Sequence, residues 1–328
     1  MPADLAIRTR ALSRTFGTLR ALDSLDLDVP RGALFALLGP NGAGKSTTIA
    51  ILTTLLAPTS GEAAVAGFDV ATRPRDVRRA MGVVFQEISL DDRLTARENL
   101  ELHAAIYGVP SRDRAGRVAA GLASVGLGST AGQRVRTFSG GMKRRLEIAR
   151  AMLHEPAVLV LDEPTVGLDP QTRRTVWDKL GEIAATRERT VFVTTHYMDE
   201  AERCDDVAVV DHGKLVARGS PAELVTRAGG ERLEVRCDDE TRTSDLARGL
   251  GWTARSADGK LVVEGARPEA MLARLAEGGA GIREATIVRP TLEDAFVALT
   301  GRGLRDVHDE DAGRHAAMAT NLRARGRR

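Results

Sequence analysis

The segment GPNGAGKST, residues 39 to 47, constrains the fold more than any other part of the chain. It follows the apolar run ALFALL, residues 33 to 38, and stands before a helical segment, so it joins a buried strand to a helix. Glycines at such a junction let backbone N–H groups approach an anion, and the helix N-terminus adds positive partial charge. The segment matches G-x-x-x-x-G-K-[ST] and predicts a phosphate-binding loop rather than a glycine-rich turn that binds nothing.

The polar residues of this loop have distinct predicted roles. Lys45 is expected to reach the β- and γ-phosphates of a nucleotide, and the Ser46 hydroxyl to take a place on Mg²⁺. The predicted nucleotide-binding residues of the loop form one run: Gly39, Pro40, Asn41, Gly42, Ala43, Gly44, Lys45, Ser46 and Thr47.

Four apolar runs that each end in a polar residue or a glycine predict a buried parallel sheet. The runs are ALFALLG (33–39), GVVFQ (82–86), AVLVLD (157–162) and TVFVTTH (190–196), with helical periodicity between them. In open α/β sheets, ligands bind outside the carboxyl ends of the strands. We therefore expect Gly39, Gln86, Asp162 and His196 to converge.

Two adjacent carboxylates follow the third of these runs. Asp162 ends the strand, which is the position from which a carboxylate holds a metal ion beside a bound nucleotide. Glu163 comes next and is placed to polarise or deprotonate an attacking water. An Asp-Glu pair at a strand end is also compatible with a solvated turn.

Composition limits the classes of protein that the chain represents. Its 328 residues suffice for one large domain and a smaller one. The 47 Lys and Arg residues nearly balance 45 Asp and Glu, and the net charge of +2 provides no broad field that attracts nucleic acid. Cys204 and Cys237 lack CxxC spacing, so neither a disulfide framework nor a zinc site is indicated. No nucleic-acid partner is expected.

No segment is expected to cross a membrane or to direct secretion. The longest apolar stretches, such as ALFALL and AVLVL, fall far short of the roughly 20 residues that a spanning helix needs. The N-terminus MPADLAIRTR has no apolar h-region of a signal peptide. A reducing cytosol is the predicted compartment.

The first predicted domain covers residues 1–228. Within it, residues 95–155 are expected to be mostly helical: Thr95 and Glu98 form a capping box, and one apolar stripe runs along Met142, Leu146, Ala149 and Leu153. Residues 206–220 predict a hairpin that turns at His212-Gly213, and a helix follows at 221–228.

A second, small α+β domain is predicted at 229–301, after Gly229-Gly230. Its expected order is strand (232–236), helix (243–250), a hairpin turning at Asp258-Gly259, helix (268–276) and strand (282–288), which resembles a split βαβ, ferredoxin-like unit. A last helix should begin at Thr291 and stop at Gly301. Residues 302–328 have the composition of a solvated, disordered tail.

The segment FSGGMKRRLEIARAM contains a second possible anion site. Ser139 is expected to cap a helix whose opening glycines, Gly140 and Gly141, expose backbone N–H groups. By itself, such a helix start is equally compatible with an anion site and with an ordinary helix cap that binds no ligand.

Taken in order, GPNGAGKST, Gln86, FSGGM, LVLDEP, GLDP and TTH resemble the motifs of an ABC ATPase nucleotide-binding domain, over residues 5 to about 228. The resemblance implies an α/β, P-loop NTPase fold of the ABC type with a helical subdomain. In that family the signature helix of one subunit caps the ATP held by the P-loop of the other, in a head-to-tail dimer. Ser139, Gly140, Gly141 and Met142 would then act in trans within a homodimer.

The resemblance also implies roles for single residues. His196 corresponds to the γ-phosphate sensor, Asp169 to a residue that communicates across the dimer, and Gln86 to the link between metal, nucleotide and membrane partner. Phe16 occupies the place of an aromatic ring stacked on adenine, although a core Phe is the alternative. Met142 stands where many members carry Gln.

The predicted catalytic residues are Lys45, Gln86, Glu163 and His196. The predicted metal ligands are Ser46, Gln86 and Asp162, and the predicted cofactors are ATP and Mg²⁺.

Within the family, HYMDEAERCDDVAVVDHGKLVARGSPAEL, SGGMKRRLEIARAM and RPTLEDAFVALTG look similar to the daunorubicin-resistance exporter ATPases. This implies an ATPase subunit that powers drug efflux through a separate integral membrane permease, as a peripheral protein on the cytoplasmic face of the membrane. Alternatives are a transporter ATPase for another substrate, such as a lipid or polysaccharide, a soluble ABC ATPase acting on ribosomes or DNA, a P-loop small-molecule kinase, and a non-catalytic regulatory nucleotide binder.

Overall fold

The computed structural model describes residues 5–227, 231–257, 259–265 and 267–301, and these residues fall into two compact units. The first unit ends at Ser220 and the second begins at Pro221. Helix α8 (Pro221–Arg227) therefore groups with the second unit rather than with the predicted first domain of residues 1–228. The physical reason is that α8 packs on α11 (Leu292–Thr300), which lies near the C-terminal end of the described chain.

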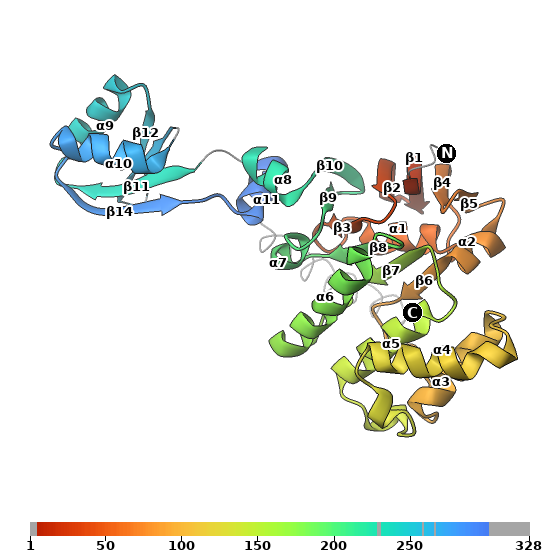
Figure 1. Cartoon of the computed structure of the whole chain (residues 1–328). Coiled ribbons are helices and arrows are strands. Elements are labelled where there is room, and N and C mark those ends of the chain that lie inside the picture. The colour runs from red at the N-terminus through yellow and green to blue at the C-terminus, as the bar shows by residue number, and fades with distance from the viewer. Residues whose placement is uncertain (1–4, 228–230, 258, 266, 302–328) are drawn as a thin grey trace, which may run out of the picture. The chain divides into compact units, whose positions relative to one another are not determined.

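The centre of the first unit is a six-stranded sheet of order β10-β9-β3-β8-β7-β6 (Figure 1). Its strands are β3 (Leu34–Leu38), β6 (Met81–Val84), β7 (Val158–Asp162), β8 (Thr190–Thr195), β9 (Asp206–Asp211) and β10 (Lys214–Gly219). Every residue of β3, β7 and β8 is buried, which explains why these strands are continuous apolar runs rather than alternating ones. Strands β9, β3, β8, β7 and β6 are mutually parallel, and β10 returns antiparallel in the predicted hairpin. The predicted parallel sheet is confirmed.

A second, antiparallel sheet packs over the first. It consists of β1 (Leu5–Phe16), β2 (Leu19–Pro30), β4 (Ser60–Val65) and β5 (Phe68–Asp69), in the order β2-β1-β4-β5. Helix α1 (Lys45–Leu52) contacts both sheets, and helix α2 (Pro74–Ala80) contacts β4, β5 and β6. The main core includes Leu27, Phe35, Ile49 and Phe192, so the helix that follows the phosphate-binding loop is held rigidly between two sheets.

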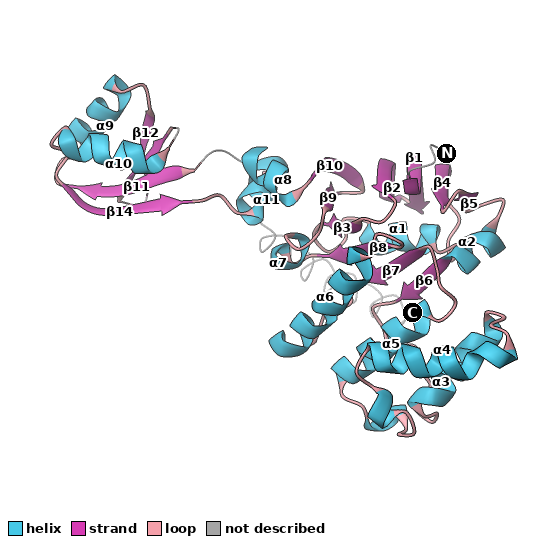
Figure 2. Cartoon of the chain, viewed as in Figure 1, coloured by secondary structure: helices cyan, strands magenta, loops and turns pink. Residues whose placement is uncertain are grey.

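Residues 95–155 form the predicted helical segment, drawn as a group of cyan helices in Figure 2. The helices are α3 (Ala96–Ile106), α4 (Ser111–Ser124) and α5 (Gly140–Met152), with 3₁₀ turns at Gly128–Thr130 and Val135–Thr137. Thr95 and Glu98 form the expected capping box. Leu146, Ala149 and Leu153 lie in the core of this segment, and Met142 packs against it, so the predicted stripe is confirmed.

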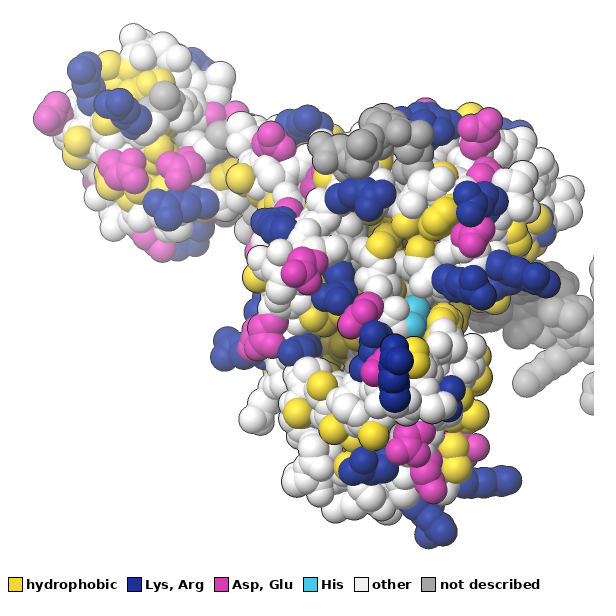
Figure 3. Space-filling model, turned by 45° about the vertical axis from the view of Figure 1, so that its right-hand side comes forward, with side chains coloured by type: hydrophobic (Ala, Val, Ile, Leu, Met, Phe, Trp, Pro, Cys, Tyr) yellow, Lys and Arg dark blue, Asp and Glu magenta, His cyan; other side chains and the backbone are white. Residues whose placement is uncertain are grey.

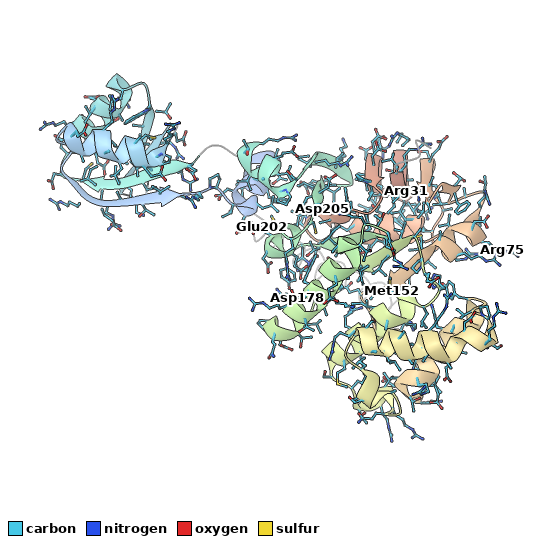
Figure 4. The ribbon with its side chains drawn as sticks, viewed as in Figure 1. Arg31, Arg75, Met152, Asp178, Glu202 and Asp205 are labelled. Carbon is cyan, nitrogen blue, oxygen red and sulfur yellow. The ribbon has the colours of Figure 1, made fainter. Side chains whose placement is uncertain are left out.

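Helices α6 (Pro170–Ala185) and α7 (Met198–Ala201) complete the first unit. Asp178 on α6 accepts a hydrogen bond from Arg203 at 2.6 Å, and Asp205 accepts one from the backbone N–H of Leu34 at 2.8 Å (Figure 4). The contact of Asp205 ties the segment before β9 to the start of β3. It is one of the interactions that align the parallel strands.

The second unit is built around a four-stranded antiparallel sheet of order β12-β13-β11-β14. The elements are β11 (Arg232–Cys237), α9 (Glu240–Gly249), β12 (Thr253–Ala257), β13 (Lys260–Glu264), α10 (Pro268–Glu277) and β14 (Ile282–Val288). Leu233, Val263, Met271 and Leu275 are among its core residues. This connectivity is that of a split βαβ unit.

Helix ends in the second unit follow local capping. Helix α9 begins at Glu240, before the predicted residue 243, because Asp239 accepts a hydrogen bond from the backbone N–H of Arg242 at 2.9 Å. Helix α11 is capped by Thr291, and Gly301 ends it with a left-handed φ of 76°. The predicted tail 302–328, the pair Gly229-Gly230 and Asp258 of the predicted turn lie outside the described residues.

The surface in Figure 3 carries Lys and Arg side chains interspersed with Asp and Glu on both units. No broad area of a single charge is visible on the face shown. Among the described helices, none has the length and apolar character required to span a bilayer.

Candidate active site

The phosphate-binding loop connects the end of β3 to α1 with the backbone geometry that its glycines allow. The N–H of Gly39 donates to the carbonyl of Thr195 at 3.3 Å, which ties the loop to β8. Gly44 has a φ of 102°, and a Cβ there would lie 2.6 Å from a methyl group of Leu22 and 2.7 Å from the carbonyl of Ala21. Both the backbone conformation and the space at position 44 therefore require glycine.

Lys45 is a buried cation at the start of α1. Its Nζ lies 2.8 Å from the carbonyl oxygen of Gly39, 3.0 Å from that of Pro40 and 3.1 Å from Oε1 of Glu163. Burial lowers the pKa of Lys45, and the negative charge of Glu163 opposes this shift. A phosphate at the loop would compete with Glu163 for this ammonium group.

Asp162 and Ser46 bring together, beside Lys45, two oxygen atoms that can bind a metal ion. The Ser46 Oγ lies 3.4 Å from Oδ1 of Asp162, and the hydroxyl of Thr194 donates to the same Oδ1 at 2.6 Å. Carboxylate and hydroxyl oxygens are the ligand types that Mg²⁺ prefers. The donor set of Asp162 and Ser46 therefore fits a magnesium ion.

Glu163 is held in an unusual backbone conformation. Its φ is 44°, in the left-handed region, and its N–H donates to the hydroxyl of Thr194 at 3.0 Å. Its Oε1 lies 3.3 Å from Nδ1 of His196. Residues in such conformations persist where surrounding contacts over-determine them, and they concentrate at functional sites. The strained position directs one carboxylate at both Lys45 and His196.

The environment of Glu163 keeps it ionised. Burial by itself would raise the pKa of this carboxyl, but the contact with His196 and the charge of Lys45 outweigh it and lower the pKa to about 2. At neutral pH Glu163 is therefore a carboxylate, able to accept a proton or to orient a water molecule.

The second predicted anion site lies at the start of α5. Ser139 caps this helix by accepting a hydrogen bond from the N–H of Met142 at 3.3 Å. A Cβ on Gly141 would lie 2.2 Å from the Cγ2 of Thr172, so the close packing of α5 on α6 itself requires glycine there. Packing thus explains Gly141 independently of any ligand.

The other predicted site residues lie on separate elements. Asp169 caps α6 by accepting from the N–H of Thr172 at 3.0 Å. Phe16, at the end of β1, is 44% exposed with the guanidinium of Arg14 4.6 Å from the ring centroid, so it is not a core side chain. Gln86 follows β6, and its backbone carbonyl accepts from Arg144 at 2.8 Å. Five of the predicted residues lie in one cluster: Lys45 and His196 contact Glu163, and Ser46 contacts Asp162, the residue that precedes Glu163.

The loop that carries Gln86 is fixed by a buried ion pair that the sequence analysis missed. Arg144 and Glu147, one turn apart on α5, lie 2.9 Å apart and are both buried. Arg144 also donates to the carbonyl of Phe85 at 2.6 Å, and the N–H of Ser89 donates to Glu147 at 2.8 Å. The available signal was the pair of opposite charges at i and i+3 within the helical stripe of α5.

Thr194 is the other residue of the cluster that was missed. Its hydroxyl donates to Asp162 and accepts from the N–H of Glu163, so it orients both carboxylates. The signal was present as two consecutive threonines at the end of a buried strand, TVFVTT.

Comparisons with known proteins give a consistent result. Residues 22–166 match the family described as ABC transporter. The daunorubicin/doxorubicin resistance ATP-binding protein DrrA of Streptomyces peucetius is 38% identical over 332 residues, covering 96% of this chain and 98% of that protein. The Nod factor export ATP-binding protein I of Cupriavidus metallidurans is 38% identical over 303 residues, covering 92% and 99%.

Two solved structures have a similar fold. The structure of cbiO1 from Clostridium perfringens, described as part of the ABC transporter complex cbiONQ, has a TM-score of 0.64 and 28% identity, covering 68% of this chain and 91% of that one. A dimeric ATP-binding cassette in a post-hydrolysis state with ADP and Pi has a TM-score of 0.59 and 26% identity, covering 65% and 98%.

Proposed function

The chain belongs to the ATP-binding proteins of the ABC transporter family, and from this premise we propose that it powers export through a separate integral membrane subunit. The observation that carries the proposal is the joining of Lys45, Glu163 and His196 by direct contacts at the end of a phosphate-binding loop. The chain is an ATPase, like the cassettes that it resembles over most of its length.

We propose drug efflux as the transport reaction, with an anthracycline-like compound as the cargo. Relatives named for daunorubicin resistance support it, as do the sequence segments that resemble them. A relative named for Nod factor export has the same identity, so export of another class of molecule is the second candidate. Both candidates place the chain at the cytoplasmic face of the membrane, bound to a permease.

Hydrolysis is assigned to the side chains of the cluster. Lys45 would exchange its contact with Glu163 for the β- and γ-phosphates of ATP, and Ser46 and Asp162 would hold Mg²⁺, with Gln86 as a further ligand. The ion, when bound, neutralises charge that develops on the phosphate oxygens. Released from Lys45, Glu163 would orient and deprotonate the attacking water, while His196 would contact the γ-phosphate.

Each nucleotide is proposed to lie between two copies of the chain. The exposed Phe16 ring is available to stack on adenine. Ser139, Gly140, Gly141 and Met142 of the second copy would close over the phosphates from the N-terminus of α5, and Asp169 would lie near the contact between copies. A dimeric cassette among the similar solved structures supports this arrangement.

Mixing two inactive variants tests whether the site is shared. Lys45→Ala impairs a chain's own phosphate-binding loop, and Ser139→Arg impairs what that chain offers to its partner. In a mixed dimer one site carries both lesions and the other carries none, so mixing should restore about a quarter of wild-type single-turnover hydrolysis at random pairing. Each variant alone is the control. Restoration no greater than the sum of the two alone would contradict a shared site.

The export proposal is tested with an integral membrane permease of about six apolar spans, to be sought in the reading frames next to this gene. The two proteins should co-purify, and in vesicles daunorubicin should raise the rate of ATP hydrolysis and accumulate on the side opposite the ATPase. Vesicles with the Glu163→Gln variant are the control for transport that does not depend on hydrolysis. Stimulation by a lipid or polysaccharide but by no drug would favour the second candidate.

A further inference from the structure

Glu200, on α7, is a buried carboxylate that the proposed chemistry does not use. Only 1% of its surface is exposed, and a charge at such a position is costly unless hydrogen bonds compensate for the lost water. Its two oxygens accept hydrogen bonds from the hydroxyl groups of Thr165 and Thr195, the latter at 2.5 Å. One side chain thus joins two segments that are distant in the sequence.

Those two threonines flank the catalytic groups. Thr165 lies two residues after Glu163, on the segment that leads to Asp169, and Thr195 directly precedes His196. The hydroxyl of Thr195 also accepts from the N–H of Tyr197 at 3.0 Å, and its backbone carbonyl accepts from the N–H of Gly39. Glu200 therefore fixes the backbone on one side of Glu163 and on both sides of His196.

A third partner connects Glu200 to helix α6. The Nε of Arg173 lies 3.9 Å from Oε1 of Glu200, and the guanidinium lies 4.4 Å from the centroid of the Tyr197 ring. That ring lies 4.1 Å from the ring of His196. Because the N–H of Arg173 donates to the carbonyl of Asp169 at 2.9 Å, a continuous set of contacts runs from His196 to the first turn of α6.

The contact between Arg173 and Glu200 differs from the others in its length. Arg173 Nε is buried and, among the described residues, has no hydrogen-bond partner. At 3.9 Å the two groups attract each other without a hydrogen bond, because the separation exceeds the roughly 2.7–3.2 Å of an N–H···O bond. It is the longest of the three polar contacts that hold Glu200.

We propose that Glu200 is a positioning residue for ATP hydrolysis, which holds Glu163 and His196 in place and links them through Arg173 to the helix that begins at Asp169. The inference rests on the proposed roles of Glu163, His196 and Asp169. Glu200 acts through Thr165 and Thr195 rather than on the nucleotide. Displacement of a catalytic group by about 1 Å can lower a rate roughly a hundredfold, so loss of these bonds should appear in turnover.

The test separates turnover from nucleotide binding. Glu200→Gln keeps the shape of the side chain and removes its charge, so kcat for ATP should fall roughly ten- to a hundredfold while KM for ATP changes less than about threefold. Thr195→Val and Thr165→Val should each lower kcat, and combining either with Glu200→Gln should add little, because each threonine variant removes one of the two hydrogen bonds that Glu200 accepts. Glu202→Gln, on an exposed neighbour two residues later, is the matched control with unchanged kcat (Figure 4).

Arg173→Met tests the link to α6. It keeps the apolar stem beside Tyr197 and removes the guanidinium, so kcat should fall with KM for ATP preserved, and its effect should not add to that of Glu200→Gln. Fully additive effects of the two substitutions would overturn the link.

The outcomes distinguish this inference from the proposed function. Absence of ATP hydrolysis by the wild-type dimer would contradict the proposed function. Wild-type hydrolysis with an unchanged kcat in Glu200→Gln, whatever its melting temperature, overturns the positioning role alone. If Glu200→Gln fails to fold, the two threonine variants decide by the same criterion. Positioning requires a lower kcat with a preserved KM for ATP, and an unchanged kcat overturns it.

Discussion

Glu163→Gln should abolish steady-state ATP hydrolysis while ATP remains bound. The amide has nearly the shape of the carboxylate but cannot accept a proton from water, and general bases contribute roughly a hundred- to ten-thousandfold to a rate. The steady-state rate of phosphate release at saturating ATP measures the loss. Turnover within tenfold of wild type would remove Glu163 from the role of general base.

The same substitution has a second expected effect, on affinity. Because Glu163 lies 3.1 Å from Nζ of Lys45, we expect it to compete with a bound phosphate for the ammonium group. The Glu163→Gln variant should therefore bind ATP at least as tightly as wild type, as measured by titration with a fluorescent analogue. Lys45→Ala is the contrasting variant: it should lose most nucleotide binding, since it removes the cation that meets the phosphates. Weaker ATP binding by Glu163→Gln would contradict the competition.

Glu147→Ala should produce the largest loss of stability among the charge-removing substitutions considered. Its carboxylate is fully buried against Arg144 and also accepts the N–H of Ser89. Removing one partner of a buried pair leaves an uncompensated charge, which typically costs about 3–5 kcal/mol. Urea unfolding measures this loss, in the transition that belongs to the first unit. The loop that carries Gln86 should also become more susceptible to proteolysis.

Two controls make the stability prediction specific to the buried pair. Glu182→Ala breaks the contact between Lys179 and Glu182, which has the same i, i+3 spacing and a separation of 2.8 Å. Because the Glu182 side chain is 66% exposed, this substitution should lower the free energy of unfolding by less than about 1 kcal/mol. Replacing both members, as Arg144→Met with Glu147→Leu, should cost less than Glu147→Ala because no charge stays buried. Equal effects of Glu147→Ala and Glu182→Ala would contradict the argument.

The helix ends show how far local sequence reaches. The capping box at Thr95 and the cap at Ser139 form where the sequence predicts them, and helix α11 begins after Thr291 as expected, since each of these features depends on residues within one turn. Helix α9 begins three residues before its predicted start because Asp239 caps it. The grouping of α8 with the second unit depends on its packing against α11, which no local pattern encodes.

The phosphate-binding loop was determined by the sequence alone. Its glycines, its lysine and the strand and helix around it are consecutive residues, so their geometry follows from backbone conformations that neighbouring side chains allow. The same reasoning located Asp162 and Glu163 at the end of a buried strand. It could not reveal that Glu163 and Lys45 are ion-paired, or that a left-handed φ directs the carboxylate toward the loop.

Only the tertiary structure decided which polar residues support the cluster. Thr194 reaches Asp162 across 32 positions because β7 and β8 are neighbours in the sheet, and Thr165 reaches Glu200 across 35 positions because α7 follows β8. Such contacts depend on strand order and register, which arise from burial of the whole sheet rather than from any short segment. The sequence thus determined the loop and the kind of chemistry, and the tertiary structure determined which residues hold Glu163 and His196 in place.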